Sequence, residues 1–363
     1  MERTFCIPAA RTSRRRARTG RLPCTRCRNQ TVTGRTYMNR LQQWRTRVAD
    51  EQLQLRGVLT ALDWYTLGIM AVYSVLAILF YPIVPRATTL LVTNALFATA
   101  IVAIAWLSQL TANRTIRLLR FFYVIPMVYP MYQQSQQLVP ALHPRDYDWL
   151  LIELDRMLFG TDPTRWMAQF AHPVLTEYLQ LCYVSFYLLP IAVALSFFAQ
   201  RRTVTMLRFG RMIVFGFYVS YLAYFALPAI GPRFTLHNFS QLEEELPGLV
   251  LTPVLRALVN EGGGIEPGEL FPERVVNRDC FPSGHTMMTL LTIILAWRCR
   301  SVLRLPVTIV GLSLIVATVY LRYHYVVDLI AGAACALAML WLEPRVYTLL
   351  VERKIAAPDT LLG

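Results

Sequence analysis

Two short polar stretches stand out in a chain that is otherwise rich in apolar residues. The first runs from Cys280 to His285 and reads C-F-P-S-G-H, and the second runs from Arg322 to Asp328. In the second stretch His324 and Asp328 are four residues apart, so one face of a helix would present both side chains. A carboxylate placed there can accept the imidazole N–H and increase the basicity of the other ring nitrogen, which predicts His324 as a nucleophile or base. His285, from a different helix, can then serve as the acid.

The residues around these histidines are suited to binding phosphate. Pro282 fits the first turn of a helix, where its missing N–H costs nothing, and free backbone N–H groups at a helix start form an anion site. Ser283 and Gly284 would contribute phosphate contacts there, and Arg233, after Gly-Pro, offers a planar fork for two phosphate oxygens. Arg322 is a further candidate. This set predicts phosphoryl transfer through a covalent phosphohistidine, and nothing in it demands a metal or another cofactor.

The elements that must position these residues are apolar helices. The chain has 363 residues, of which 55% are hydrophobic and 16% charged. Eight apolar segments are long enough to cross a bilayer, at roughly residues 65–84, 89–110, 121–139, 174–198, 209–230, 282–297, 306–320 and 325–342. The sequence therefore predicts an all-α, polytopic membrane bundle of about eight transmembrane helices.

The composition along the chain predicts four regions. Residues 1–56 form a basic, disordered cytoplasmic tail, with Met38 as another conceivable start, and residues 57–112 form two accessory transmembrane helices. Residues 113–345 form the membrane core that carries the chemistry, and residues 346–363 form a short cytoplasmic tail.

The positions of the arginines predict the orientation. Arginines precede the first segment, lie between segments two and three, four and five, and six and seven, and follow segment eight. By the positive-inside rule these connections and both termini are cytoplasmic, so the histidine motifs lie on the periplasmic or extracellular face of a bacterial inner membrane. The net charge of +14 is then explained by loops that face anionic lipid, without nucleic acid as a partner.

One stretch of the first outer loop, residues 147–160, has apolar residues at helical spacing but is too charged to span. It is predicted as an amphipathic helix on the membrane surface, with Asp148 and Asp155 on its solvated face. Cys280 is expected to be a small buried residue with neither a disulfide nor a nucleophilic role.

The two polar stretches resemble the second and third signature motifs of the type-2 phosphatidic acid phosphatase superfamily. The resemblance rests on Cys280 to Thr286 and on Tyr323 to Asp328 with Leu329 to Gly332 after it. The version here is similar to the branch of inositol phosphorylceramide synthases and inositolphosphotransferase-like proteins. It implies a six-helix core, His324 as nucleophile, Asp328 as its orienting carboxylate and His285 as leaving-group acid.

Two features depart from the pattern of that superfamily. Its first motif, a lysine followed by Arg-Pro, is absent, and Thr318 stands where an arginine usually precedes the nucleophilic histidine. Arg233 and Arg322 are the candidates to supply the missing positive charge.

Several alternatives stay open at this level. A lipid phosphate or phosphodiester is the expected substrate, and water or an alcohol or lipid acceptor would decide between a phosphatase and a transferase. Isoprenoid (undecaprenyl) diphosphate dephosphorylation is the second candidate, and a transporter or a non-catalytic membrane scaffold is a candidate of another class. Metal or haem ligation by His285 and His324 lacks further ligands. The sequence does not predict the oligomeric state.

Overall fold

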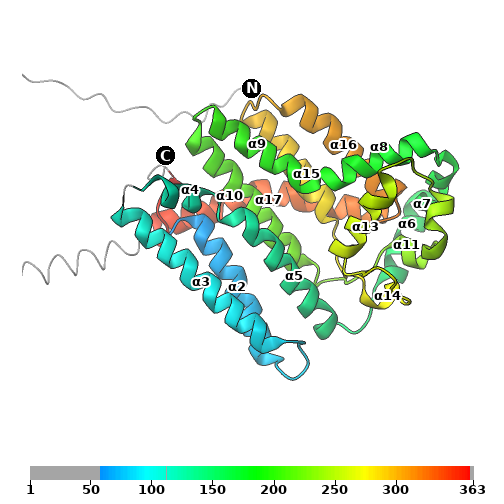
Figure 1. The fold of residues 1–363 in the computed structure, drawn as a ribbon, viewed down its shortest axis with the longest axis horizontal. Helices are drawn as coiled ribbons and strands as arrows, with labels where there is room; N and C mark the ends of the chain where they lie inside the picture. The colour runs from blue at the N-terminus through cyan, green and yellow to red at the C-terminus, as the bar shows by residue number, and fades with distance from the viewer. Residues whose placement is uncertain (1–57, 112, 360–363) are drawn as a thin grey trace, which may run out of the picture. The chain divides into compact units, whose positions relative to one another are not determined.

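The computed structural model of the protein describes residues 58–111 and 113–359, and these residues form helices joined by short loops (Figure 1). Within these ranges there is no strand, and the only β-type pairing is an isolated bridge between Thr60 and Ala357. The predicted basic tail and Met38 lie outside the described residues. The protein is an all-α membrane bundle, as predicted.

Each predicted apolar segment contains a helix. Four of the spans are long and apolar enough to cross a membrane, and Arg304–Tyr320 is a shorter apolar helix. The helices found in the eight predicted segments are, in order, α2 (Ala61–Leu79), α3 (Ala87–Leu110), α5 (Val124–Leu142), α8 (Pro173–Val184) continued by η3 (Ser185–Tyr187) and α9 (Leu188–Ala199), α10 (Thr203–Ala223), α15 (Gly284–Arg298), α16 (Arg304–Tyr320) and α17 (Val326–Glu352).

Short helices fill the loops, and several of them gather at one end of the long helices (Figure 1). Those at that end are α6 (Asp148–Phe159), α7 (Pro163–Met167), α11 (Pro232–Thr235), α13 (Thr252–Gly262) and α14 (Pro272–Val275). The remaining short helices are α4 (Arg114–Phe122), η2 (Ala168–Phe170), η4 (Phe239–Gln241) and α12 (Leu242–Glu245). The two polar motifs lie at the starts of α15 and α17.

Helix α17 continues to Glu352, ten residues beyond the predicted end of its apolar segment at 342. The apolar run ends at Glu343, but this carboxylate is buried and pairs with Arg211 of α10, with Nε and Oε1 2.5 Å apart. Asp359 binds the same guanidinium. A charge that is neutralised by a buried partner does not end a helix, and Arg211 therefore acts as a structural group inside the bundle.

The centre of the bundle is closely packed where α10 meets α15. A Cβ atom added to Gly216 would lie 2.8 Å from Leu291 Cδ1, so a larger residue there would require the Leu291 side chain to shift. Polar contacts join the outer helices, and the Gln134 amide of α5 donates to Asn94 of α3 over 2.7 Å. The packing fixes the positions from which α15 and α17 present their first turns.

Candidate active site

The starts of α15 and α17 are bonded to each other. Ser283 caps α15, and its hydroxyl oxygen accepts the Thr286 N–H at 3.2 Å. The Ser283 N–H donates to the Asp328 carbonyl over 3.0 Å, and a Cβ on Gly332 would lie only 2.5 Å from the Ser283 carbonyl oxygen. The sequence at these helix starts thus allows the backbones to touch, which brings the two polar motifs together.

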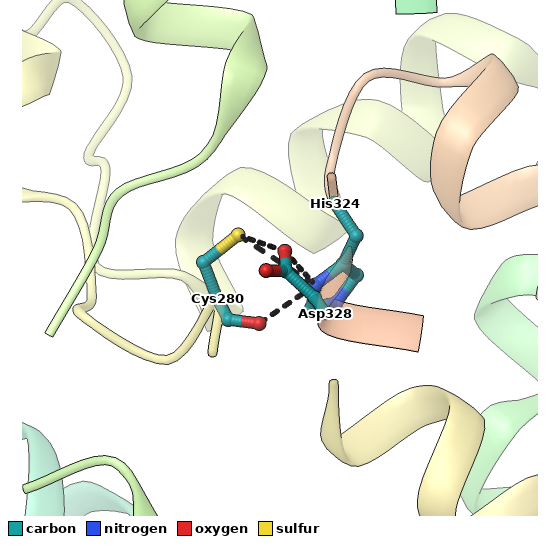
Figure 2. Close-up of side chains that lie close together, drawn as sticks. All are labelled: Cys280, His324 and Asp328. Atoms are coloured by element: carbon teal, nitrogen blue, oxygen red, sulfur yellow. Dashed lines mark hydrogen bonds and ion pairs between the residues drawn. The ribbon is translucent and has the colours of Figure 1, made fainter. Parts of the chain in front are cut away.

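The imidazole of His324 is held by two acceptors on one side. Its Nδ1 lies 2.9 Å from the Cys280 carbonyl oxygen and 3.4 Å from Asp328 Oδ2 (Figure 2). A carbonyl oxygen can only accept a hydrogen bond, so Nδ1 carries the proton and the lone pair is on Nε2. The nitrogen that holds the lone pair, Nε2, is therefore the one that points away from Asp328.

His285 faces that free nitrogen. Its Nδ1 lies 3.3 Å from His324 Nε2, and since Nε2 holds a lone pair, His285 Nδ1 is the donor. The His285 ring stacks on Tyr183 with centroids 4.6 Å apart and contacts Phe186 at 4.4 Å. The structure thus brings together His285, His324 and Asp328, the three residues predicted from the sequence to perform the chemistry.

Cys280 lies behind this group. It is buried, as predicted, but it also makes a hydrogen bond that the sequence did not indicate, because its Sγ lies 2.9 Å from Asp328 Oδ2 (Figure 2). Burial, and then the charge of Asp328, raise the pKa of the Cys280 thiol well above its ordinary value. The protonated thiol donates to the carboxylate and helps to fix its orientation.

The same three side chains are close enough to bind a metal ion, since the possible ligand atoms of Cys280, His324 and Asp328 lie within 4.8 Å of one another. Binding would require a thiolate and an unprotonated Nδ1. Burial favours the protonated thiol, and the Cys280 carbonyl accepts the proton of Nδ1, so a metal would have to displace both protons. The hydrogen-bonded group therefore fits these residues better than a metal centre does.

Helix α6 corrects one expectation from the sequence, because Asp148 and Asp155 are buried rather than solvated. Asp155 accepts the N–H groups of Val326 and Val327 at 2.9 and 2.8 Å, which caps the start of α17. Burial raises the pKa of both carboxyl groups, and the hydrogen bonds from backbone N–H groups oppose that rise. The two carboxylates attach α6 to the loop before α11 and to the start of α17.

The loop that carries Arg233 is attached by the other α6 carboxylate. Asp148 accepts the N–H groups of Ile230 and Gly231 at 3.0 and 2.8 Å. Gly231 has φ of 95°, and a Cβ there would lie 2.7 Å from the Tyr323 carbonyl oxygen, so only glycine fits. The Arg233 guanidinium is buried, lies over the Tyr323 ring at 4.9 Å and donates to Asn260 Oδ1 over 2.9 Å.

A cavity of about 380 Å³ opens in front of the two histidines. Its lining includes His285, His324, Arg233 and Gly284, together with Asp279 and a group of aromatic residues that, except Tyr323, lie outside the two polar stretches. The aromatic members are Tyr129, Tyr132, Tyr183, Phe186, Tyr187, Phe217, Tyr221, Tyr224 and Tyr323. Asp279 directly precedes the first polar stretch, Cys280 to His285. That position was the one feature of the sequence that could have identified it as a site residue.

Two residues predicted to bind phosphate are not part of this lining. Arg322 is buried and its guanidinium pairs with Glu245, while Ser283 is buried and its hydroxyl is engaged in capping. Gly284 does line the cavity, but the hydroxyls of Tyr224 and Ser220 approach it so closely that a Cβ would lie 2.5 and 2.9 Å from them. Among the predicted phosphate ligands, Arg233 therefore has the most direct access.

Comparison with known families gives one match. A family model described as the PAP2 superfamily matches residues 149–342, which include α6 except its first residue, Asp148, together with the Arg233 loop and both polar motifs. No curated protein and no solved structure matches the chain.

Proposed function

The chain belongs to the PAP2 superfamily, and from that premise we propose that it is a membrane-embedded lipid phosphatase or phosphotransferase that works through a phosphohistidine on His324. The observation that carries the proposal is the Nδ1 contact of His324 with the Cys280 carbonyl at 2.9 Å, which leaves the lone pair on Nε2, the nitrogen that faces His285 at the cavity wall. Membership of the superfamily supports a phosphatase-like enzyme. The identities of the nucleophile and of the phosphoryl acceptor are what we propose in addition.

In the first step His324 Nε2 attacks the phosphorus of a lipid phosphate ester. The P–N bond forms, the bond from phosphorus to the leaving oxygen breaks, and His285, protonated on both ring nitrogens beside the bound anionic phosphate, gives its Nδ1 proton to that oxygen and becomes neutral. As Nε2 gains positive character, the Nδ1–H draws closer to Asp328, whose Oδ2 lies 3.4 Å away. Asp328 thereby stabilises the imidazolium without taking its proton.

In the second step an oxygen nucleophile attacks the phosphohistidine. Water would release the phosphate product, and an alcohol would take over the phosphoryl group, with the resemblance to inositolphosphotransferase-like proteins favouring the alcohol. The attacking O–H returns its proton to His285, and the P–N bond breaks to restore the Nε2 lone pair. The same two histidines thus serve both steps in opposite directions.

The distance between the two histidine rings limits where a phosphoryl group can bind. Reacting atoms in a near-attack arrangement are about 3–3.5 Å apart, and Nε2 to His285 Nδ1 already measures 3.3 Å. A phosphoryl group between these nitrogens requires the His285 ring to move away from His324. The Arg233 guanidinium and the backbone N–H groups at the start of α15 would hold the phosphoryl oxygens in the space that opens.

Purified protein incubated with labelled phosphatidic acid, phosphatidylinositol and an isoprenoid diphosphate, each with and without a lipid alcohol, tests the proposal. We expect turnover of at least one lipid phosphate, and product transferred to the alcohol if the protein is a transferase. A parallel incubation with a chelator tests metal ligation by Cys280, His324 and Asp328 directly.

His324→Ala is expected to lose turnover by about 10⁴-fold or more, because the covalent step is removed. His143→Ala is the matched control, since His143 lies outside the cavity lining. Equal rates in wild type and His324→Ala would exclude the mechanism, and turnover abolished by the chelator would favour a metal centre. Turnover of none of the lipids by folded wild type would favour a scaffold or transporter.

A further inference from the structure

The cavity in front of His324 has charges of both signs. Besides the two histidines, the titratable groups of opposite formal charge among the described lining residues are Arg233 and Asp279. A phosphate pairs with the arginine but is repelled by the carboxylate. The cavity is therefore complementary to a molecule that carries a phosphate and, beyond it, a group that a carboxylate attracts.

Asp279 has no cationic side chain to neutralise it within residues 58–111 and 113–359. Its one hydrogen bond there comes from the Tyr132 hydroxyl, which lies 2.5 Å from Oδ2. The neighbouring Arg278 is directed elsewhere and pairs with Asp146, with Nε and Oδ1 3.2 Å apart. A half-buried carboxylate is costly without a counter-charge, so a cation from the ligand would stabilise it.

Tyrosines form the wall beside this carboxylate. The ring of Tyr221 lies between those of Tyr132 and Tyr224, with centroids 5.6 and 6.2 Å away. Its hydroxyl is buried at the cavity wall, where it interacts with the Tyr187 hydroxyl but makes no close hydrogen bond among the described residues. An unpaired buried hydroxyl at a cavity wall indicates a ligand that supplies a hydrogen-bond donor or acceptor.

We propose that the Asp279 end of the cavity binds a primary ammonium group, so that the substrate is a zwitterionic phosphodiester lipid with a phosphoethanolamine-type headgroup. A primary ammonium has three N–H donors, which match the Asp279 carboxylate and the Tyr221 hydroxyl, while the tyrosine rings add cation–π attraction. A quaternary ammonium would use the rings but not these acceptors. A diphosphate would place its second phosphate near the carboxylate.

This inference rests on the proposed function and specifies its first step. The headgroup is enclosed by the cavity and stays on phosphorus, so His324 Nε2 forms the P–N bond as the bond from phosphorus to the diacylglycerol oxygen breaks. His285 protonates that oxygen, and diacylglycerol returns to the bilayer. Water or an acceptor alcohol then takes the phosphoethanolamine group from His324 and gives its proton to His285.

The test compares kcat/KM for phosphatidylethanolamine, phosphatidylcholine, phosphatidylinositol, an isoprenoid diphosphate and phosphatidic acid in mixed micelles. We expect wild type to prefer phosphatidylethanolamine. In Asp279→Asn the ratio of kcat/KM for phosphatidylethanolamine to that for phosphatidic acid should fall by about 10- to 100-fold, as expected for loss of a charged hydrogen bond. Glu266→Gln, which changes an exposed carboxylate outside the cavity lining, should leave the ratio unchanged.

Tyr221→Phe removes only the unpaired hydroxyl and carries the test if Asp279→Asn does not fold; its ratio should fall by about 3- to 10-fold. A preference for phosphatidylinositol, phosphatidylcholine or the diphosphate would overturn the inference, and so would unchanged ratios in both variants. These outcomes leave the proposed function intact, because that function is tested separately by wild-type turnover of any lipid phosphate, by the loss of turnover in His324→Ala and by the response to a chelator.

Discussion

The side chain of His324 depends on a backbone carbonyl as much as on a carboxylate. Cys280 supplies both that carbonyl, 2.9 Å from Nδ1, and a thiol 2.9 Å from Asp328 Oδ2. Spacing in the sequence predicted the His324–Asp328 pair, because residues four apart share a helix face. It could not predict Cys280 as a partner, because that contact joins residues 44 positions apart.

Asp328→Asn tests the carboxylate in this arrangement. Oδ2 accepts from the Cys280 thiol and from the Tyr325 N–H at 2.9 Å, and the amide would lose the charge that stabilises the imidazolium. We expect kcat to fall by about 10²- to 10⁴-fold with little change in KM. Cys280→Ser, which keeps a donor, should retain most activity. Equal losses in the two variants would indicate disrupted packing instead.

His237 supplies a prediction about pH. Burial, and then the charge of Arg322, lower its pKa to about 4, against the opposing effects of Glu245 and Asp162. The unfolded state takes up a proton on His237 near pH 6.5, but the folded state does so only near pH 4. The stability that the neutral side chain of His237 contributes to the folded state is therefore complete above pH 6.5 and is lost as the pH falls towards 4.

Thermal unfolding in detergent at a series of pH values measures the effect of His237. Wild type should lose up to about 3 kcal/mol relative to His237→Gln between pH 7 and 4. The difference between the two proteins isolates His237 from Asp148 and Asp155, whose raised pKa values act in the opposite direction. Parallel curves for the two proteins would contradict the prediction.

Helix α6 attaches two loops that are distant in the sequence. Its bounds, Asp148–Phe159, lie close to the predicted 147–160, because the apolar spacing and the glycine stop are local signals. Its environment was predicted wrongly, because the partners of its carboxylates at Gly231 and Val326 come from other parts of the chain. Asp148 and Asp155 are seven residues apart and share a helix face, which was the signal that both could have one role.

Asp155→Ala tests the attachment of α6 to α17. Two N–H groups at the start of α17 would lose their acceptor, and we expect a loss of about 1–3 kcal/mol in unfolding free energy together with reduced kcat. Glu153→Ala on the exposed face of the same helix is the control and should change neither quantity. Unfolding curves that match in the two variants would show that the attachment is not needed.

Across the whole molecule, the locations and types of the helices followed from the sequence, while the buried ion pairs did not. Apolar runs identify membrane helices because backbone groups in lipid must bond internally. Arg211, at the start of the predicted segment 209–230, would count as an orienting arginine by its position in the sequence, but it pairs with Glu343 and Asp359 inside the bundle. Arg120, between segments two and three, likewise pairs with buried Asp63. The remaining connecting arginines still favour cytoplasmic termini, so we keep that proposal.

Cysteine labelling tests this orientation. Leu270→Cys lies in the exposed loop before α15, and Arg300→Cys lies in the turn between α15 and α16. A membrane-impermeant maleimide added to intact cells should label the first variant above the wild-type background and leave the second unlabelled. The reverse pattern would place the cavity on the cytoplasmic side.

The central claim is that phosphorus becomes bonded to His324. Wild-type protein quenched during turnover of a lipid labelled with radioactive phosphorus should carry label that is stable in base and labile in acid, located on the peptide containing His324. The label should be absent from His324→Ala and present in His143→Ala. Label that persists in His324→Ala, or turnover by wild type with no such label, would contradict the account.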